Sequence, residues 1–320
     1  MPDVLDEIRV ACRAVAEGAR HLRVVESRVA ALAEALPPVP EVAGLDAQHH
    51  WLGHGEGTAV FVLLLDAVNF GSGWSAQLRK PPGHSTYFMT AAALKAWFER
   101  EGVPAPEHVI ALRPEDLAVI FGQDAGADSP VRGLLELWAR SLRELAQLVQ
   151  REFAGEWLGP IHAANGRAAR LVEVLGMLPS WHDVATWRGH TVPFFKRAQI
   201  TCADLHHAAG GAWWGRWHDL PRLTAFADNV VPHVLRCEGV LEYGPELAAR
   251  VDAGRELEPG SEEEVEIRAA GVHGVELLVA ALEASGRAAT AMGVDQLLWQ
   301  RGRAPTFKSR RSHRTQTSFY

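Results

Sequence analysis

Hydrophobic positions recur every three or four residues along most of the chain, which is the spacing of one face of an α-helix. The pattern begins in residues 4–36, where two such stretches are ended by the proline-rich segment PPVPEV. We therefore predict an N-terminal pair of helices within residues 1–40. The same spacing predicts further helices over residues 89–102, 114–121, 131–153, 165–176, 193–207, 245–253, 262–285 and 291–301.

One apolar stretch is ambiguous. The segment TAVFVLLLDAVNF, residues 58–70, fits a buried strand or a buried helix, but it lacks the alternation of a strand and its neighbours are helical. We predict a helix that is too short to cross a bilayer, with Asp66 inside it paired to Lys196 or Arg197. The whole pattern predicts an all-α fold over residues 1–320, in a single globular unit or in two closely packed helical subdomains.

Composition and charge narrow the possible partners. The chain has 320 residues, 48% of them hydrophobic, and a formal net charge of −7, which argues against binding to polymeric nucleic acid or to an anionic membrane. Its three cysteines are far apart, and its N-terminus is charged from the third residue, without the apolar core of a signal peptide. These features favour a cytoplasmic protein with a small-molecule partner. The histidines lack a metal-ligand spacing, so we expect no metal site.

Two adjacent cations lie in the segment FFKRAQITCADL. Burying a cation without a partner is costly, so each requires an anion. With Pro193 in the first turn of a helix, Arg197 shares a face with Asp204, which we predict as its internal partner. Lys196 projects about 100° around the helix and is left without such a partner. We therefore expect Lys196 to bind a phosphate or carboxylate of a ligand.

The segment FADNVVPHVL places a carboxylate before a helix start. Pro232 cannot lie in a helix interior, but it suits the first turn, which puts Asp228 just ahead of that turn. Asp228 is then either an N-terminal cap or an anion directed at a developing positive charge.

A second carboxylate occurs in GVDQLLWQR, where Gly293 indicates a helix start and Asp295 lies in the first turn. Trp299 follows one turn later on the same face. A carboxylate beside an aromatic ring suits a flat, hydrogen-bonding heterocycle, although a capping aspartate with a core tryptophan has the same pattern. The basic segment 303–320 is either a solvated terminus or docks near the site, and we expect docking.

Six segments together resemble one known family: LLLDAVNF, PFFKRAQITCADL, FADNVVPHVL, EEEVEIRAAGVHGVELL, VDQLLWQ and HRTQTSFY. In order from about His49 to Tyr320, they resemble the queuosine salvage family, the queuosine 5'-phosphate N-glycosylases. The resemblance implies a helical fold related to DNA glycosylases. It also implies hydrolysis of queuosine 5'-monophosphate to queuine and ribose 5-phosphate, without a metal or organic cofactor. The turn from Gly71 to Gly73 departs from the aromatic residues usual there.

The resemblance also implies site residues. The FAD motif falls on Phe226 to Asp228, and the aspartate of a late block falls on Asp295. One of these carboxylates stabilises positive charge on the sugar or directs water onto C1', and the other binds the edge of the base. The remaining candidates bind substrate: His49 the base or its cyclopentenediol, Phe226 the base by stacking, Lys196 the 5'-phosphate with help from the basic tail, and Asn229 and Trp299 nearby.

Two other functions fit parts of the pattern. A DNA base glycosylase would keep the fold, but the acidic net charge and the lack of a recognisable glycine-rich hairpin for duplex backbone count against it. In a non-enzymatic helical interaction module, the aspartates would be caps and the tryptophans core residues. The sequence makes no prediction about the oligomeric state.

Overall fold

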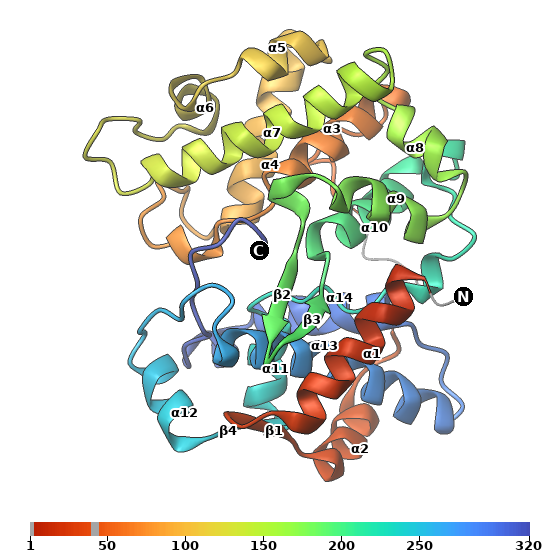
Figure 1. Ribbon diagram of the computed structural model, residues 1–320, viewed down its shortest axis with the longest axis vertical. Helices are drawn as coiled ribbons and strands as arrows, with labels where there is room; N and C mark the ends of the chain where they lie inside the picture. Colours follow the sequence, from red (N-terminus) through yellow and green to blue (C-terminus); the bar gives the residue numbers. More distant parts are fainter. Residues whose placement is uncertain (1–2, 40–44) are drawn as a thin grey trace. The chain divides into compact units, whose positions relative to one another are not determined.

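The computed structural model describes residues 3–39 and 45–320. Helices dominate, and the strands in the described residues form only two two-stranded sheets, so the all-α prediction is confirmed (Figure 1). A DNA-glycosylase-like architecture stays a prediction. The chain divides into two units, which are described separately. The first unit comprises Met1–Ala43, Val184–Lys196 and Pro221–Gln316, and the second comprises Gly44–Asp183, Arg197–Leu220 and Thr317–Tyr320.

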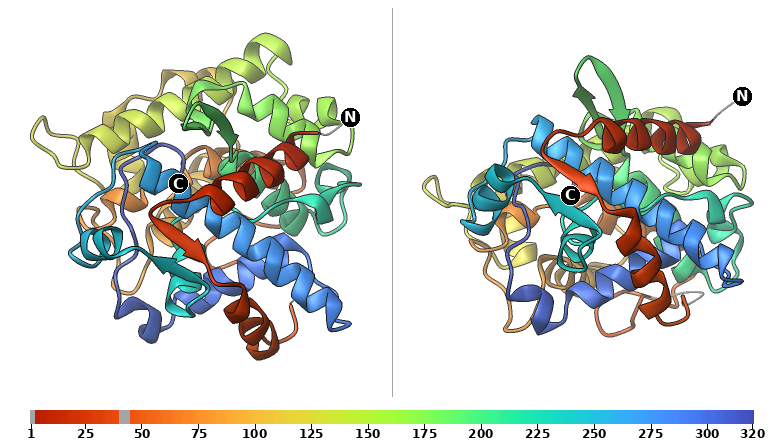
Figure 2. Two further views of the ribbon diagram at one scale, coloured as in Figure 1. Left: turned by 60° about the horizontal axis from the view of Figure 1, so that its bottom comes forward. Right: turned by 90° about the horizontal axis from the view of Figure 1, so that it is seen from below.

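The first unit is built around α13 (Glu262–Ala284), with α1 (Val4–Gly18) packed along it in every view (Figures 1 and 2). Ser261 caps α13 by accepting a hydrogen bond from the Glu264 amide. Most of the following four turns are buried, including the charged side chains of Glu264, Glu266 and Arg268, which therefore need partners inside the protein. The other helices of the unit are α2 (Glu26–Ala35), α11 (Val231–Cys237), α12 (Pro245–Asp252), α14 (Ala291–Gly302) and α15 (Pro305–Lys308).

Four short strands in this unit were not predicted: β1 (Leu22–Val24), β2 (Val184–Trp187), β3 (His190–Pro193) and β4 (Leu241–Tyr243). β1 pairs with β4 and β2 with β3, both antiparallel. Runs of three or four residues are too short to show a period of two. Pro193 ends β3, so its predicted place in a helical first turn is wrong, and α10 (Lys196–Ala209) begins three residues later.

A buried carboxylate joins these strands to α13. Glu266 accepts hydrogen bonds from the amides of Arg20 (3.1 Å) and His21 (2.8 Å) and from Nε1 of Trp187 (3.2 Å). Arg188, in the turn between β2 and β3, forms an ion pair with it at 3.3 Å. Glu266 is fully buried, and these donors offset the cost of removing its charge from water.

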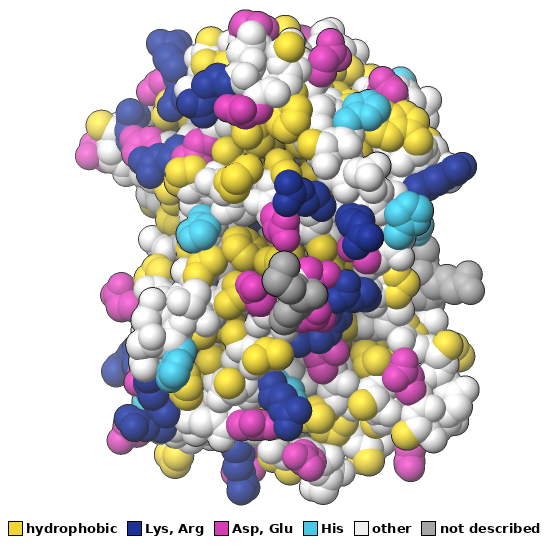
Figure 3. Space-filling model, turned by 45° about the vertical axis from the view of Figure 1, so that its right-hand side comes forward, with side chains coloured by type: hydrophobic (Ala, Val, Ile, Leu, Met, Phe, Trp, Pro, Cys, Tyr) yellow, Lys and Arg dark blue, Asp and Glu magenta, His cyan; other side chains and the backbone are white. Residues whose placement is uncertain are grey.

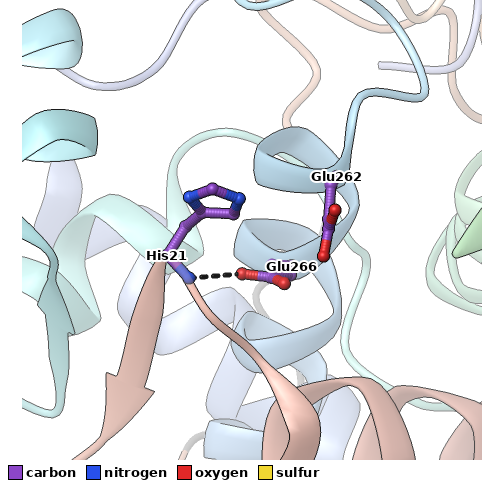
Figure 4. Close-up of side chains that lie close together, drawn as sticks. All are labelled: His21, Glu262 and Glu266. Atoms are coloured by element: carbon purple, nitrogen blue, oxygen red, sulfur yellow. Dashed lines mark hydrogen bonds between the residues drawn. The ribbon is translucent and has the colours of Figure 1, made fainter. Parts of the chain in front are cut away.

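His21, Glu262 and Glu266 bring three potential metal-ligand atoms within 4.8 Å of one another (Figure 4). Arg188 also pairs with Glu262, so one guanidinium bridges both carboxylates of the cluster. A metal ion would have to displace this cation and the donors of Glu266. We assign no metal to the cluster.

The second unit contains the predicted apolar segment as α3 (Glu56–Ala67), whose residues Thr58 through Ala67 are all buried. The helical interpretation of this segment is confirmed. Its longest helix, α7 (Arg132–Glu152), packs against α5 (Pro106–Ala111) and α6 (Pro114–Phe121), as Figure 1 shows. The other helices are α4 (Thr86–Glu101), α8 (Gly159–Ala164), α9 (Ala168–Gly176) and α10 after its first residue. No helix in the described part of the chain has the length and apolarity of a membrane span.

Arg197 is buried in the second unit, but its partner is not Asp204 as predicted. Its side chain donates to the carbonyl oxygens of Asp66 (3.3 Å), Ala67 (2.8 Å) and Ser180 and to the hydroxyl of Ser141 (3.0 Å). The last carbonyls of a helix lack intrahelical donors, so a cation at the C-terminus of α3 is favourable there. Arg197 therefore binds Asp66 through the main-chain carbonyl oxygen of Asp66. The carboxylate of Asp66 accepts a hydrogen bond from Asn69 (3.1 Å).

We expect Arg197→Met to lower the free energy of unfolding by about 3–5 kcal/mol, because it leaves several buried oxygens without a donor. Urea unfolding measures the change. Arg100→Met is the matched control, since Arg100 is 59% exposed and, among the residues that the structure describes, forms an ion pair with Glu101 alone; its loss should cost about 0.5 kcal/mol or less. A cost for Arg197→Met as small as that of the control would contradict this account.

Candidate active site

Asp228 lies three residues before the start of α11, and Pro232 is the second residue of that helix, as the sequence predicted. One oxygen of Asp228, Oδ1, accepts hydrogen bonds from the amides of Val230 (2.8 Å) and Val231 (2.9 Å). The N-cap residue of α11 is Val230, without a side-chain cap, so the capping alternative is met only in part: Asp228 binds two amides at the helix start from outside the cap position. Oδ2 has no hydrogen bond to any residue that the structure describes, and the side chain is only partly buried. One oxygen fixes the carboxylate, and the other is open to a ligand.

Asp295 does not cap a helix. α14 begins at Ala291, as in the predicted range 291–301 and not at Gly293, and Thr290 caps it by accepting a hydrogen bond from the Gly293 amide (3.1 Å). Asp295 therefore lies beyond the first turn. Its Oδ1 accepts a hydrogen bond from the amide of Phe226 (2.8 Å), across 69 residues of sequence. Asp295 thus holds the FAD segment and brings the two predicted carboxyl groups together in the first unit.

The two carboxyl groups titrate as a pair. Burial raises the pKa of Asp295 well above its usual range, and the negative charge of Asp228 adds to the shift. Burial also raises the pKa of Asp228, although the Val231 amide and the charge of Lys196 oppose the increase. Asp295 is 4% exposed, whereas Asp228 is partly open and accepts two amide hydrogens. We therefore expect Asp295 to hold its proton to a higher pH than Asp228 does.

Lys196 is the first residue of α10 and is 6% exposed. Its positive charge lowers the pKa of both Asp228 and Asp295, so it lies within electrostatic range of both. Lys196 was predicted to have no partner within the chain. That prediction is wrong, because its charge interacts with the carboxyl groups of Asp228 and Asp295.

Arg268 was not predicted as a site residue. It lies on α13, is 1% exposed, and donates through Nε to the carbonyl oxygen of Ala227 (3.0 Å). Its guanidinium lies over the ring of Phe194 at 4.0 Å and 3.7 Å from Glu264. The hydrogen bond to the Ala227 carbonyl oxygen fixes the main chain immediately before Asp228. In the sequence, the sign of a role for Arg268 was its position between the apolar residues Ile267 and Ala269 in the VEIRA segment.

The other candidate site residues of the first unit lie close to Asp228 or Asp295 in the sequence. Phe226 is 4% exposed, and its amide is the one bound by Asp295. Asn229 is partly exposed and directly follows Asp228. Trp299 lies four residues after Asp295 on α14, so the two share a helix face, and the guanidinium of Arg303 is 5.5 Å from its ring. Their roles in substrate binding stay predictions.

His49 belongs to the second unit, in the turn before α3. Its Nδ1 is 2.8 Å from Oδ1 of Asp46, and its ring is 4.6 Å from that of Phe88 and 5.6 Å from that of His84. The contact with Asp46 fixes the tautomer, because a carboxylate accepts the proton of Nδ1. His49 can therefore present Nε2 as a hydrogen-bond acceptor beside aromatic rings, and its role stays a prediction.

The basic C-terminal segment is not a solvated tail. His313 and Thr315 are buried, and the carbonyl oxygen of Arg314 accepts a hydrogen bond from the Leu257 amide (2.8 Å). In the second unit the Gly71 amide donates to the main-chain oxygen of Tyr320 at 3.2 Å. Gly71 has φ of +112°, a conformation that favours glycine. Docking of the segment at the active site stays a prediction.

The chain belongs to the queuosine salvage protein family, whose pattern matches residues 49–320. It is 38% identical over 320 aligned residues to a protein of Sphaerobacter thermophilus named queuosine 5'-phosphate N-glycosylase/hydrolase, and the match covers 96% of each chain. Proteins of the same name in Dictyostelium discoideum and Mus musculus are 34% and 28% identical. Those matches cover 82% and 84% of this chain and 78% and 83% of the relatives. The family resemblance is thereby confirmed.

Proposed function

We propose that the protein hydrolyses the N-glycosidic bond of queuosine 5'-monophosphate, releasing queuine and ribose 5-phosphate. The names of the relatives support this activity, and the first of them matches the chain along almost its whole length. The observation that carries the chemistry is the hydrogen bond from the Phe226 amide to Asp295, which joins the two carboxyl groups. Most glycosidases act through a pair of carboxyl groups in different protonation states.

In the proposed reaction the bond between C1' and the base nitrogen breaks, and its electron pair stays with the base. Positive charge develops on the sugar, and the ionised Asp228 stabilises it through Oδ2. The hydroxyl of a water molecule adds to C1', and the base leaves with a proton. Asp295, protonated in its buried position, donates a hydrogen bond or a proton to the departing base. Queuine is a 7-deazapurine and lacks the ring nitrogen at which purines are commonly protonated, so another atom of the base must be the acceptor.

The remaining residues are assigned to binding. Lys196 holds the 5'-phosphate, and a charge-assisted hydrogen bond of this kind contributes about 1.5–3 kcal/mol. His49 contacts the base or its cyclopentenediol, and Phe226 offers a stacking face. Asn229 and Trp299 complete the contacts. These assignments rest on the family resemblance and on the environments described above.

Incubating the purified chain with queuosine 5'-monophosphate tests the activity directly. We expect free queuine and ribose 5-phosphate to appear in equal amounts, in proportion to the enzyme added. Base release from duplex DNA, with binding that weakens steeply as salt rises, would favour a DNA glycosylase instead. The face drawn in Figure 3 intersperses Lys and Arg with Asp and Glu side chains, which is unfavourable for such binding. No turnover of any nucleotide would favour an interaction module.

Lys196→Met tests the phosphate contact. We expect kcat/KM for queuosine 5'-monophosphate to fall about tenfold to hundredfold, the equivalent of one charged hydrogen bond. The nucleoside queuosine is the internal control, because it has no phosphate and reports any change that the lost charge causes at Asp228. An equal loss for nucleotide and nucleoside would show that Lys196 does not bind the phosphate.

A further inference from the structure

The turn that carries His49 in the second unit is built around Asp46. The carbonyl oxygen of Asp46 accepts hydrogen bonds from the amide of His50 (3.0 Å) and from its Nδ1 (2.8 Å). Lys95 donates to the carbonyl oxygen of Ala47 (2.6 Å). These contacts hold the main chain of the turn in place, although the side chain of Asp46 is 46% exposed.

The ring of His50 anchors this turn to α4. A carbonyl oxygen can only accept, so Nδ1 of His50 donates to Asp46, and Nε2 accepts from the hydroxyl of Tyr87 (2.8 Å). His50 is 2% exposed, and burial lowers its pKa, so the ring is neutral at neutral pH. Both ring nitrogens of His50 are thereby used inside the protein, and His50 has a structural role.

The carboxylate of Asp46 fixes the ring of His49. Its Oδ1 accepts a hydrogen bond from the His49 amide (2.8 Å) and lies 2.8 Å from Nδ1 of the same residue. Partial burial raises the pKa of Asp46, but the hydrogen bonds from His49 outweigh this and lower it overall. The carboxylate is therefore ionised at neutral pH and can only accept. Nδ1 of His49 carries the proton, and Nε2 is left as an acceptor.

Nε2 of His49 can be reached by a ligand. The side chain of His49 is 15% exposed, and Nε2 makes no hydrogen bond to any residue that the structure describes. It is also not among the buried polar atoms that lack a partner in the described residues, so it retains accessible surface. In contrast to the nitrogens of His50, this atom is oriented by the protein and left open.

The rings around His49 favour a non-planar group with a hydrogen-bond donor. The rings of Phe88 and His84 lie 4.6 Å and 5.6 Å from that of His49, at interplanar angles of 51° and 69°. These three rings are too tilted to stack together on a flat heterocycle, but they suit the CH groups of a puckered carbocycle. An acceptor beside such rings matches a hydroxyl group on that carbocycle.

We propose that Asp46 is a positioning residue for substrate selection. It holds His49 so that Nε2 accepts a hydrogen bond from a hydroxyl group of the cyclopentenediol, and it thereby favours queuine over deazaguanine bases that lack this ring. This selection rests on the proposed function, because the identity of the base comes from it. Asp46 itself acts through His49 and has no contact with the base.

Titration calorimetry of the full chain with two free bases tests the proposal. The bases are queuine and 7-aminomethyl-7-deazaguanine, which has the same bicycle and an amine but no cyclopentenediol. We expect the wild type to bind queuine at least about fivefold more tightly, the equivalent of one hydrogen-bonding group left unpaired. Asp46→Ala should remove most of this preference. Asp46→Asn should retain it, because the asparagine oxygen still accepts a hydrogen bond from Nδ1 of His49.

Asp116→Ala is the matched control. Asp116 also belongs to the second unit, is 41% exposed, and accepts hydrogen bonds from the amide (2.9 Å) and Nε (3.3 Å) of Arg113, three residues away. We expect this variant to leave the preference for queuine unchanged. In a His49→Phe background, which keeps a ring and removes Nε2, Asp46→Ala should change the preference no further.

Several results would overturn the role of Asp46. They are the absence of queuine binding, equal affinity of the wild type for the two bases, and a preference that survives Asp46→Ala. A loss of affinity by the same factor for both bases would assign the effect to the shared bicycle or to folding. A further change of preference in the His49→Phe background would show that Asp46 does not act through His49.

Base release from queuosine 5'-monophosphate is measured separately. Selective queuine binding that depends on Asp46, in a chain that releases no base, would contradict the proposed function alone. Base release together with an unchanged preference in Asp46→Ala would contradict the role of Asp46 alone.

Discussion

Asp228→Asn is expected to lower kcat for queuosine 5'-monophosphate by about a thousandfold or more, with little change in KM. The asparagine oxygen can still accept hydrogen bonds from the Val230 and Val231 amides, so the turn before α11 keeps its cap. What disappears is the negative charge that the proposed mechanism places next to C1'. An electrostatic contact made mainly in the transition state is worth about a hundredfold to a thousandfold, and an ionised carboxylate in a buried site more. Single-turnover release of queuine measures the effect.

Asp219→Asn is the matched control for this variant. Asp219 also binds two amides at a helix start, those of Ala168 (2.6 Å) and Ala169 (3.1 Å), but it belongs to the second unit. We expect its replacement to lower stability slightly and to leave kcat unchanged. If Asp228→Asn retains most of the wild-type rate, or loses it only in step with a loss of folded protein, Asp228 is a cap and the proposed mechanism is wrong.

The fold was predictable wherever hydrophobic spacing extends over several turns. α3, α4, α6, α7, α9, α12, α13 and α14 all fall close to their predicted ranges. β1 and β4 could not be found this way, because each is three residues long and pairs with a strand more than 200 residues away. Pro193 was misplaced for a related reason: a proline suits a helix start and a strand end equally well, and only the pairing of β3 with β2 decides between them.

The candidate site was predictable in its residue types and not in its connections. Asp228 and Asp295 were found from their places near helix starts, but the Phe226 amide that joins them is visible only in three dimensions. Arg197 illustrates the same limit. Helical spacing placed it beside Asp204, whereas the side chain instead reaches carbonyl oxygens at the end of α3. Helix geometry predicts which residues share a face of the helix. Tertiary packing determines which partner a flexible side chain binds.

The rate should depend on pH through the protonation of Asp228 and Asp295. In the proposed mechanism, activity requires Asp228 ionised and Asp295 protonated. The rate should therefore rise as pH increases through the lower apparent pKa of the pair and fall as pH increases through the upper one. We therefore expect a bell-shaped profile for the wild type. Because burial raises the pKa of both groups, both limbs should lie above the ordinary range of aspartate.

Asp295→Asn separates the two limbs. The amide oxygen can still accept the hydrogen bond from Phe226, but the side chain has no proton to lose in this range, so the alkaline limb should disappear while the acidic limb remains. Loss of a general acid costs about a hundredfold or more in kcat. Asp219→Asn should keep the bell shape of the wild type. An alkaline limb that persists in Asp295→Asn would assign that limb to another group and would leave Asp295 only its structural hydrogen bond to the Phe226 amide.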